Sequence, residues 1–277
     1  MAYRCFEVEV ENQVGHLRFC RPDELNSMVV EFWRELPEIV DRLSDDGGVR
    51  VLVMSSTGKH FSAGMDLSVF TSGALSAGGE PGRVNSARRM LVLRLQQAFS
   101  SVERARMPVL AAIQGGCIGG AVDLVCACDM RYASRDAFFV VQETNLAMTA
   151  DVGTLQRLPK LVPDGVAREL VYTGRRMPAA EAESVGLVNR VYDDQAALLT
   201  GVLELAAEIA TKSPLAIWGC KQALVYARDH AVADSLDQVA GWQSAAFQPA
   251  DPTEAFAART AGRTPVYQDL PAVPQGL

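Results

Sequence analysis

Three carboxylates and a glycine-rich run are the residues whose types and spacing allow chemistry. Asp123, Glu143 and Asp151 are separated by 20 and 8 positions, and they follow the run GGCIGG at residues 115–120. A glycine run that opens a helix presents unpaired backbone N–H groups to an oxyanion, and nearby carboxylates can take up and release protons. The combination predicts proton transfer through an enolate.

A second loop, KHFSAGMD at residues 59–66, is the expected partner of this glycine run. A thioester carbonyl placed between the backbone N–H groups of Met65 and Gly120 would receive two hydrogen bonds, which strengthen as the oxygen becomes negative. We expect His60 to shape the loop and Asp66 to hold it by accepting backbone hydrogen bonds. The alternative is that the glycines serve only tight turns and helix packing.

Each acid also has a structural alternative. Asp151 precedes a helical pattern that starts near Leu155, which is typical of an N-cap, and Asp123 falls in the first turn of the helix expected after the glycine run. Glu143 follows an apolar strand and fits a solvated strand end. A proton donor at neutral pH requires a raised pKa, whereas a helix N-terminus favours the charged form. Only the three acids together with both loops favour catalysis.

Composition excludes several classes of protein. The chain has 277 residues, 49% of them hydrophobic, and a net charge of −7, so we expect a full core and no nucleic-acid partner. No apolar run reaches the roughly 20 residues of a membrane helix, and no leader pattern is seen, so we expect a cytoplasmic protein without a membrane partner. A dinucleotide fingerprint is absent, which argues against nicotinamide cofactors. An anionic ligand would find local positive charge at Arg21 and Lys59.

The cysteines and histidines indicate no metal site and no hydrolytic triad. The histidines are scattered and none is paired with a nucleophile in a known motif. Cys126 and Cys128 lack a second pair of ligands for zinc. Because a chain of this length needs no disulfides, the six cysteines are expected to be reduced and buried: Cys5, Cys20, Cys117, Cys126, Cys128 and Cys220.

The elements that must position these residues alternate between strands and helices. A hairpin is predicted over residues 6–19, strands over 49–55, 108–114, 130–133 and 137–141, and helices over 27–43 and 85–104. The first helix has Asn26 or Ser27 as its expected cap. Residues 71–82 are expected to form a mobile loop beside the site. From Asp151 onward almost only helices are expected, which predicts an α/β core with a helical C-terminal region.

The motifs FSAGMDL (61–67) and GGCIGG (115–120) resemble the enoyl-CoA hydratase/isomerase (crotonase) superfamily, and the resemblance covers nearly the whole chain. Within that superfamily, Asp123, Glu143 and the stretch ADVGTLQRLPK (150–160) are similar to the Δ3,5-Δ2,4-dienoyl-CoA isomerases. Ser213-Pro214 and residues 226–230 extend the match into the C-terminal helices.

The resemblance implies a fold and a mode of binding. The expected α/β fold is a crotonase-like spiral of ββα units, with residues 1–195 as the core that holds the CoA-binding and catalytic site. Residues 196–277 would form a helical trimerisation region of a homotrimer or homohexamer. Acyl-CoA is the implied ligand, with no separate cofactor and no metal. Met65 and Gly120 would form the oxyanion hole, and Lys221 is a further candidate contact for the nucleotide end. The other implied CoA contacts are Leu25, Ser62, Ala63, Gly64 and Asp66.

The resemblance also implies a reaction, the conversion of 3,5-dienoyl-CoA to 2,4-dienoyl-CoA by a proton shift from C2 to C6. Glu143 is assigned as the base near C2 and Asp151 as the acid near C6, with Asp123 tuning the pair. An enoyl-CoA hydratase is the first alternative, although hydratases usually carry two glutamates and lack the third acid. A non-catalytic acyl-CoA binder or oligomeric scaffold is the second.

Overall fold

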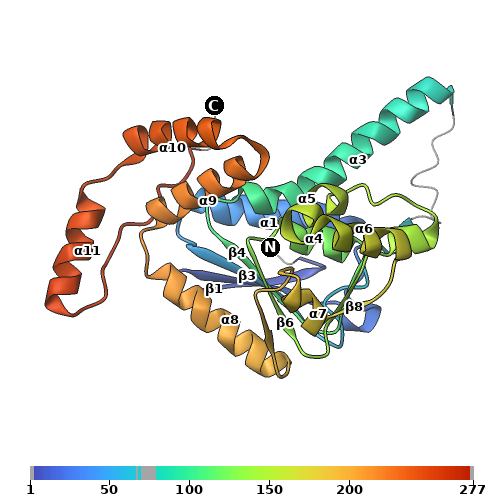
Figure 1. The fold of residues 1–277 in the computed structure, drawn as a ribbon, viewed down its shortest axis with the longest axis horizontal. Coiled ribbons are helices and arrows are strands. Elements are labelled where there is room, and N and C mark those ends of the chain that lie inside the picture. The colour runs from blue at the N-terminus through green and yellow to red at the C-terminus, as the bar shows by residue number, and fades with distance from the viewer. Residues whose placement is uncertain (1–2, 67, 70–78, 275–277) are drawn as a thin grey trace.

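The computed structural model describes residues 3–66, 68–69 and 79–274, and its centre is a six-stranded sheet with the order β1-β2-β3-β4-β6-β9 (Figure 1). The hairpin β1-β2 is antiparallel and each later neighbour is parallel. Crossovers through helices explain why the parallel strands are buried, apolar runs. The strands are β1 (Phe6–Glu11), β2 (Val14–Phe19), β3 (Val51–Ser56), β4 (Val109–Ile113), β6 (Met130–Ser134) and β9 (Arg190–Tyr192).

A smaller sheet carries the glycine run. Its order is β5-β7-β8, with β5 parallel to β7 and β7 antiparallel to β8. The strands are β5 (Gly116–Ile118), β7 (Phe138–Val140) and β8 (Met177–Pro178). Because β5 ends two residues before α4 (Gly120–Ala127) begins, the glycine run forms a turn from strand to helix.

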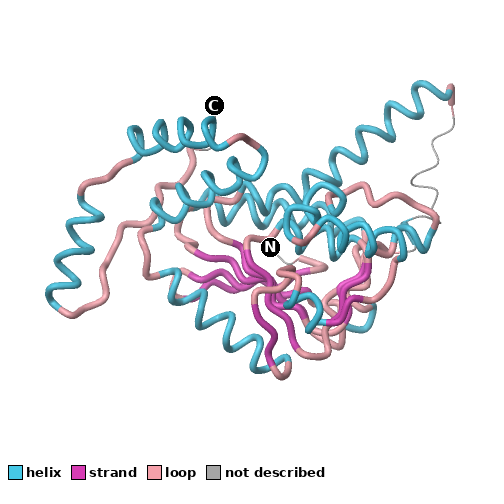
Figure 2. Tube along the Cα trace, in the orientation of Figure 1, coloured by secondary structure: helices cyan, strands magenta, loops and turns pink. Residues whose placement is uncertain are grey.

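Side chains of β3 alternate between the two faces of the large sheet. Val51 and Val53 pack against α8 (Gln195–Ala210), whereas Leu52 and Met54 join the larger core beneath α1 (Val30–Asp46) and α3 (Pro81–Arg104). This is the period of two that a strand imposes. Figure 2 shows the strands of the large sheet between α8 on one side and α1 and α3 on the other.

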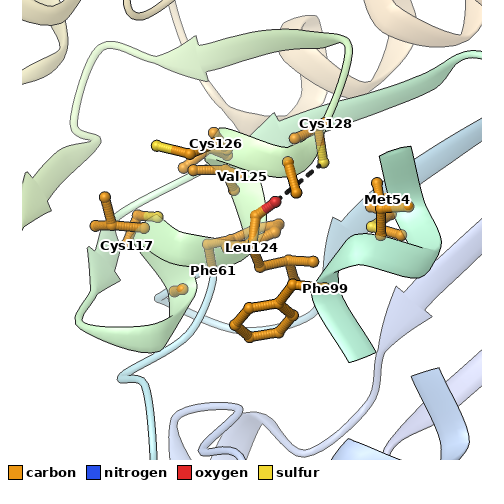
Figure 3. Packing of buried hydrophobic residues seen from close by; sticks show 14 of the residues in the cluster. Met54, Phe61, Phe99, Cys117, Leu124, Val125, Cys126 and Cys128 are labelled. Carbon is orange, nitrogen blue, oxygen red and sulfur yellow. Dashed lines mark hydrogen bonds between the residues drawn. The ribbon is translucent and has the colours of Figure 1, made fainter. Parts of the chain in front are cut away.

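The larger core continues around α4. Phe61, Phe99 and Leu124 are fully buried and pack with the sulfur-bearing side chains near them (Figure 3). All six cysteines are free, and Cys5, Cys117, Cys126 and Cys128 are buried, as expected. The prediction of burial was wrong for Cys220, which is exposed on α9 (Pro214–Asp229), and only in part right for Cys20.

The C-terminal helices leave the body and the chain then returns to it. The segments α10 (Val232–Ala246) and α11 (Ala250–Ala261) form an arm that projects from the sheet (Figure 1). The tail beyond the arm is held by Arg50, which donates hydrogen bonds to Asp269 Oδ1 at 2.8 Å and to the Tyr267 carbonyl at 2.7 Å. The chain that leaves the arm is therefore attached to the body through Arg50.

The remaining helices each have ten residues or fewer. They are η1 (Pro22–Glu24), η2 (Glu143–Leu146), α5 (Thr154–Leu161), α6 (Asp164–Thr173) and α7 (Ala179–Ser184). The predicted boundary between residues 195 and 196 stays a prediction. It falls at the start of α8, which packs on the large sheet. No helix in the described part of the chain is long and apolar enough to cross a membrane.

The predicted start of the first helix was wrong. The helix begins at Val30, and its N-cap Val29 makes no side-chain hydrogen bond. Asn26 instead donates to the carbonyls of Thr57 and His60, at 2.8 and 3.0 Å, and therefore joins two loops. The second predicted helix, over residues 85–104, is α3, and it begins at Pro81, four residues before the predicted start. Of the expected mobile loop, residues 71–78 lie outside the described residues, and residues 81–82 belong to α3.

Candidate active site

Two loops meet beside β5. The backbone of Ser62 bonds to both ends of that strand, donating to the Gly116 carbonyl and accepting from Ile118 N–H, each at 3.1 Å. Gly64 has a φ of +83°, and a Cβ there would lie 2.5 Å from the carbonyl oxygen of Ile118. Only glycine permits this conformation and this close approach together.

Two backbone N–H groups lie next to each other where the loops meet. Met28 donates to the Gly64 carbonyl at 2.8 Å and accepts from Asp66 N–H at 3.2 Å, so its backbone holds both sides of Met65. A Cβ on Gly120 would lie 4.0 Å from Met65 N. Neither Met65 N–H nor Gly120 N–H donates to any group within the described ranges. This is the arrangement that the predicted oxyanion hole requires, and the role of the two groups stays a prediction.

His60 and Asp66 hold the first loop, as expected from the sequence. His60 Nδ1 accepts a hydrogen bond from Gly116 N–H at 2.8 Å, and burial lowers the pKa of His60 so that the neutral, accepting ring is favoured. Asp66 accepts hydrogen bonds from Ser68 N–H at 2.9 Å and from Ser27 Oγ at 2.7 Å. The hydrogen bonds from Ser68 and Ser27 lower the pKa of Asp66, so it remains a carboxylate.

Asp123 lies fully buried in the first turn of α4. Its Oδ1 accepts a hydrogen bond from Thr154 N–H, the first residue of α5, at 2.5 Å. Its Oδ2 is buried and has no partner within the described part of the chain. Burial raises the pKa of Asp123 to about 6, although the hydrogen bonds from Thr154 oppose this shift.

Glu143 begins η2 with its carboxylate turned toward the glycine run. A Cβ on Gly119 would lie 3.2 Å from Glu143 Oε1, and Oε2 is buried without a partner among the described residues. Burial, followed by the negative charge of Asp123, raises the pKa of Glu143 to about 7. The alternative of a solvated strand end was therefore wrong.

Asp151 is not the cap of a helix. The helix begins three residues later, its N-cap is Gly153 with a φ of +140°, and Asp123 binds its first N–H group. Asp151 is solvent-accessible, and partial burial of its carboxyl raises its pKa. Burial is the main cause of the raised pKa values of Asp123 and Glu143, and the charge of Asp151 raises both further.

The residues expected to contact CoA lie together, although their side chains differ in access. Leu25 is exposed, and its carbonyl accepts a hydrogen bond from Ala63 N–H at 3.0 Å. Ser62 is fully buried and its hydroxyl donates to the Asn26 carbonyl at 2.8 Å, so its hydroxyl proton is already engaged. The predicted CoA contacts in this loop, Gly64 and Asp66 included, stay predictions.

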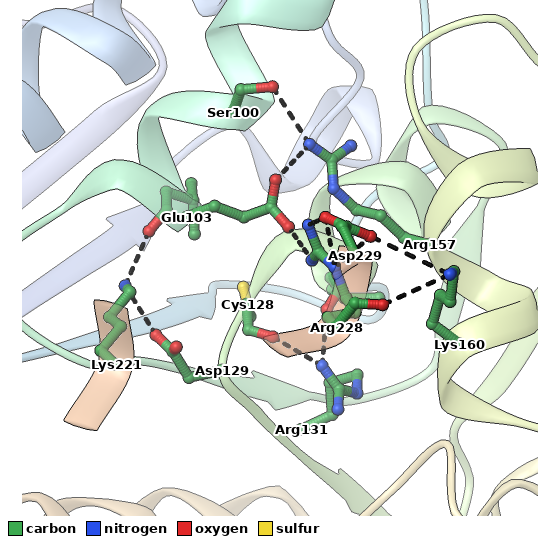
Figure 4. A network of polar contacts seen from close by, with 12 residues as sticks. Ser100, Glu103, Cys128, Asp129, Arg131, Arg157, Lys160, Lys221, Arg228 and Asp229 are labelled. Atoms are coloured by element: carbon green, nitrogen blue, oxygen red, sulfur yellow. Dashed lines mark hydrogen bonds and ion pairs between the residues drawn. The ribbon is translucent and has the colours of Figure 1, made fainter. Parts of the chain in front are cut away.

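Lys221 was wrongly predicted to contact the nucleotide end. Its side chain is only 3% exposed, and Nζ donates to the carbonyls of Val102 and Met107 and to Asp129 Oδ2, at 2.9, 3.0 and 2.8 Å (Figure 4). An ammonium group has three protons, and all three are used here. Lys221 is therefore a structural residue that joins α9 to the core.

The sequence reasoning missed the residues that fix the segment around Asp151. Gln96 donates to the Asp151 carbonyl, and Arg157 binds Glu103 and Ser100. No local pattern marks them, because their partners are more than 50 positions away. Nowhere in residues 3–66, 68–69 and 79–274 do three or more His, Cys, Asp or Glu side chains gather as metal ligands.

The fold and the site together define a class of protein, an α/β enzyme that sets two free backbone donors beside buried carboxyl groups of raised pKa. A profile of the enoyl-CoA hydratase/isomerase family matches residues 9–269, and the chain belongs to that family.

Two relatives carry the same name. The human mitochondrial Δ3,5-Δ2,4-dienoyl-CoA isomerase is 44% identical over 252 residues, which are 90% of this chain and 77% of the relative. The peroxisomal Δ3,5-Δ2,4-dienoyl-CoA isomerase of Arabidopsis thaliana is 40% identical over 97% of this chain and 99% of the relative. These two relatives are mitochondrial and peroxisomal, so the expectation of a cytoplasmic protein is corrected.

Hydratases of the family are more distant. The crotonyl-CoA hydratase of Syntrophomonas wolfei is 33% identical over 78% of this chain and 80% of its own length. The crystal structure of an enoyl-CoA hydratase from Bacillus anthracis superposes with a TM-score of 0.85 at 31% identity, covering 95% of this chain and 99% of that one. The crotonase fold that the resemblance implied is confirmed.

Proposed function

We propose that this protein is a dienoyl-CoA isomerase that converts 3,5-dienoyl-CoA to 2,4-dienoyl-CoA. The family membership supports acyl-CoA chemistry, and the two relatives at 40 and 44% identity carry the name of this isomerase. The CoA moiety is part of the substrate, and the reaction requires no other cofactor and no metal.

The thioester carbonyl accepts hydrogen bonds from Met65 N–H and Gly120 N–H, which stabilise the negative oxygen of the intermediate. Glu143 removes a proton from C2, and the electron pair spreads through the two double bonds to C6. Asp151 gives a proton to C6, which leaves the double bonds at C2 and C4. With a pKa of about 7, Glu143 is poised to accept a proton near neutral pH.

The observation that carries this proposal is the pair of buried carboxyl oxygens without partners, Asp123 Oδ2 and Glu143 Oε2. Buried polar atoms are nearly always hydrogen-bonded, so two such oxygens beside two free N–H donors indicate a place for a polar substrate. A hydratase needs two acids around one water. The third acid, Asp151, has a raised pKa and is not used to cap a helix, which favours the isomerase.

The CoA moiety is proposed to follow the backbone from Ser62 to Asp66, with Leu25 forming one wall of its adenine pocket. The chain is proposed to form trimers, alone or paired into hexamers, through the C-terminal helices. Large apolar side chains on this region are exposed, and a hollow of about 370 Å³ lies between α9, α10, α11 and the tail. Light scattering after size-exclusion chromatography measures the oligomeric state. A monomer would contradict the proposed trimer or hexamer.

The test of the activity is an ultraviolet assay with a 3,5-dienoyl-CoA and a 2-enoyl-CoA offered separately. We expect conjugated 2,4-dienoyl absorbance to grow with the first substrate, and this growth to be lost in Asp151→Asn while the melting temperature is retained. Loss of 2-enoyl absorbance alone would establish the hydratase. No change in absorbance with either substrate would support the non-catalytic binder.

A further inference from the structure

The segment that carries Asp151 is attached to α3 by a long-range hydrogen bond. Gln96, on the face of α3 that turns toward this segment, donates from Nε2 to the main-chain carbonyl of Asp151 at 2.7 Å. The Asp151 carboxyl group accepts no hydrogen bond from another side chain in the described part of the molecule. Its position is therefore set by its backbone.

A second attachment lies six residues further on. Arg157 donates from Nη2 to Glu103 Oε2 at 2.6 Å and to Ser100 Oγ at 3.1 Å, and the Arg157 and Glu103 side chains are only 11% and 14% exposed. Burial alone would raise the pKa of Glu103, but hydrogen bonds from Arg157 and Arg228 lower it, so the carboxylate stays ionised (Figure 4). The pair thus joins α3 to α5, and Arg228 extends it to α9.

Arg157 also packs against the backbone of Gly153, which lies between these two attachments. A Cβ at Gly153 would lie 1.9 Å from Arg157 Nη1, so the guanidinium occupies the space of a missing side chain. Arg157 therefore reaches back over the first turn of α5 toward α3. Thr154 N–H also donates to Asp123, so the segment is held at residues 151, 154 and 157.

We propose that Gln96 and the Glu103–Arg157 pair are positioning residues, which set the Asp151 carboxyl group against C6 of the substrate. The proposal rests on the proposed function. Glu143 and the two N–H donors belong to other elements, η2, the first loop and α4, so these contacts do not hold the C2 end of the reaction. A displacement of about 1 Å at one reacting group can cost about 10²-fold in rate.

The consequence is a separation of the two proton transfers. Without its attachment, Asp151 delivers the proton to C6 more slowly, while Glu143 still removes the proton from C2. The intermediate then returns more often to the starting thioester, and in D₂O this return places deuterium at C2. We therefore expect Gln96→Leu to lower kcat for isomerisation about tenfold or more, with KM little changed.

The experiment measures two rates in D₂O with the full-length protein, formation of the 2,4-dienoyl product and deuterium uptake at C2 of recovered 3,5-dienoyl-CoA. We expect the ratio of uptake to product to rise in Gln96→Leu and in Arg157→Lys, toward the ratio of Asp151→Asn. Gln97→Leu, the exposed neighbour, is the matched control and should equal the wild type. Gln96→Lys keeps a donor and should recover part of the lost rate.

Three results would overturn the positioning role. The first is an unchanged kcat in Gln96→Leu. The second is an equal fall of product formation and of deuterium uptake in this variant, so that their ratio stays constant. The third is a loss of rate that is explained by a lower melting temperature of the variant. Glu103→Gln, which keeps the shape of the side chain without its charge, provides a second variant if Arg157→Lys folds poorly. If the wild-type protein neither exchanges nor isomerises the dienoyl thioester, the proposed function itself has failed.

Discussion

Asp123 Oδ1 accepts a hydrogen bond from the backbone N–H of Thr154 at 2.5 Å, across 31 positions of sequence. One oxygen of this buried carboxyl group therefore caps α5, while the other remains without a partner in the described structure. Asp123 links the helix that follows the glycine run to the segment that carries Asp151. It also places a charge beside Glu143, which raises the pKa of that residue.

The pH dependence of the rate should follow Glu143. As the base, Glu143 must be ionised, and its pKa is about 7. We expect log kcat/KM for the dienoyl substrate to rise with a slope of one as pH approaches ~7 from below, and to fall at higher pH where Asp151 loses the proton that it gives to C6. In Asp123→Asn the nearby charge is lost while an oxygen remains for Thr154 N–H, so the rising limb should move to lower pH. A limb at the same pH in this variant would show that Glu143 does not control it.

Glu143→Gln should stabilise the fold, and only at higher pH. At pH values below about 4.5, the ordinary pKa of Glu143, its carboxyl group is protonated in both the folded and the unfolded chain. As pH rises to about 7, the unfolded chain ionises first, so the wild-type protein loses stability. We expect the variant to gain on the order of 2 kcal/mol at pH 8 and almost nothing at pH 4.5. Urea unfolding at both pH values measures this, and an equal gain at both would contradict the argument.

Gly64→Ala should damage the oxyanion loop. A methyl group there would lie 2.5 Å from the Ile118 carbonyl oxygen at a φ that disfavours alanine, so the loop must shift and Met65 N–H with it. We expect kcat/KM to fall about 10²-fold or more. Gly165→Ala is the matched control, because a Cβ at that position in α6 meets nothing within 4 Å. It should keep full activity and match or exceed the wild-type stability by up to about 1 kcal/mol.

Lys221→Met should lower stability without weakening substrate binding. The change removes the lysine donor from two carbonyl groups and from Asp129, which keeps the hydrogen bond from Val109 N–H to its Oδ2. Loss of one partner from a buried ion pair costs about 3–5 kcal/mol, so thermal unfolding should occur at a clearly lower temperature. KM for the acyl-CoA substrate, measured below that temperature, should stay at the wild-type value. A raised KM with unchanged stability would restore Lys221 as a nucleotide contact.

The strands and the larger helices could be predicted from the sequence because their signals are local. The alternating pattern of the hairpin and the apolar runs of β3 and β4 reflect burial of one or both faces of a sheet, which each segment shows by itself. The cap of α1 was predicted wrongly for a related reason. Asn26 has the side chain of a cap, but its amide finds carbonyl partners 31 and 34 positions away.

The sequence by itself determined the residue types of the site: three acids at set spacing, and glycines where a positive φ and a close approach leave no alternative. Only the tertiary structure decided which acid accepts from the first N–H group of α5, that Oε2 of Glu143 is buried, and that Lys221 is bound within the core. The physical reason is the same in each case. A pKa and a hydrogen bond depend on what surrounds a group in space, and the partners of Asp123, Glu143 and Lys221 come from other elements of the fold.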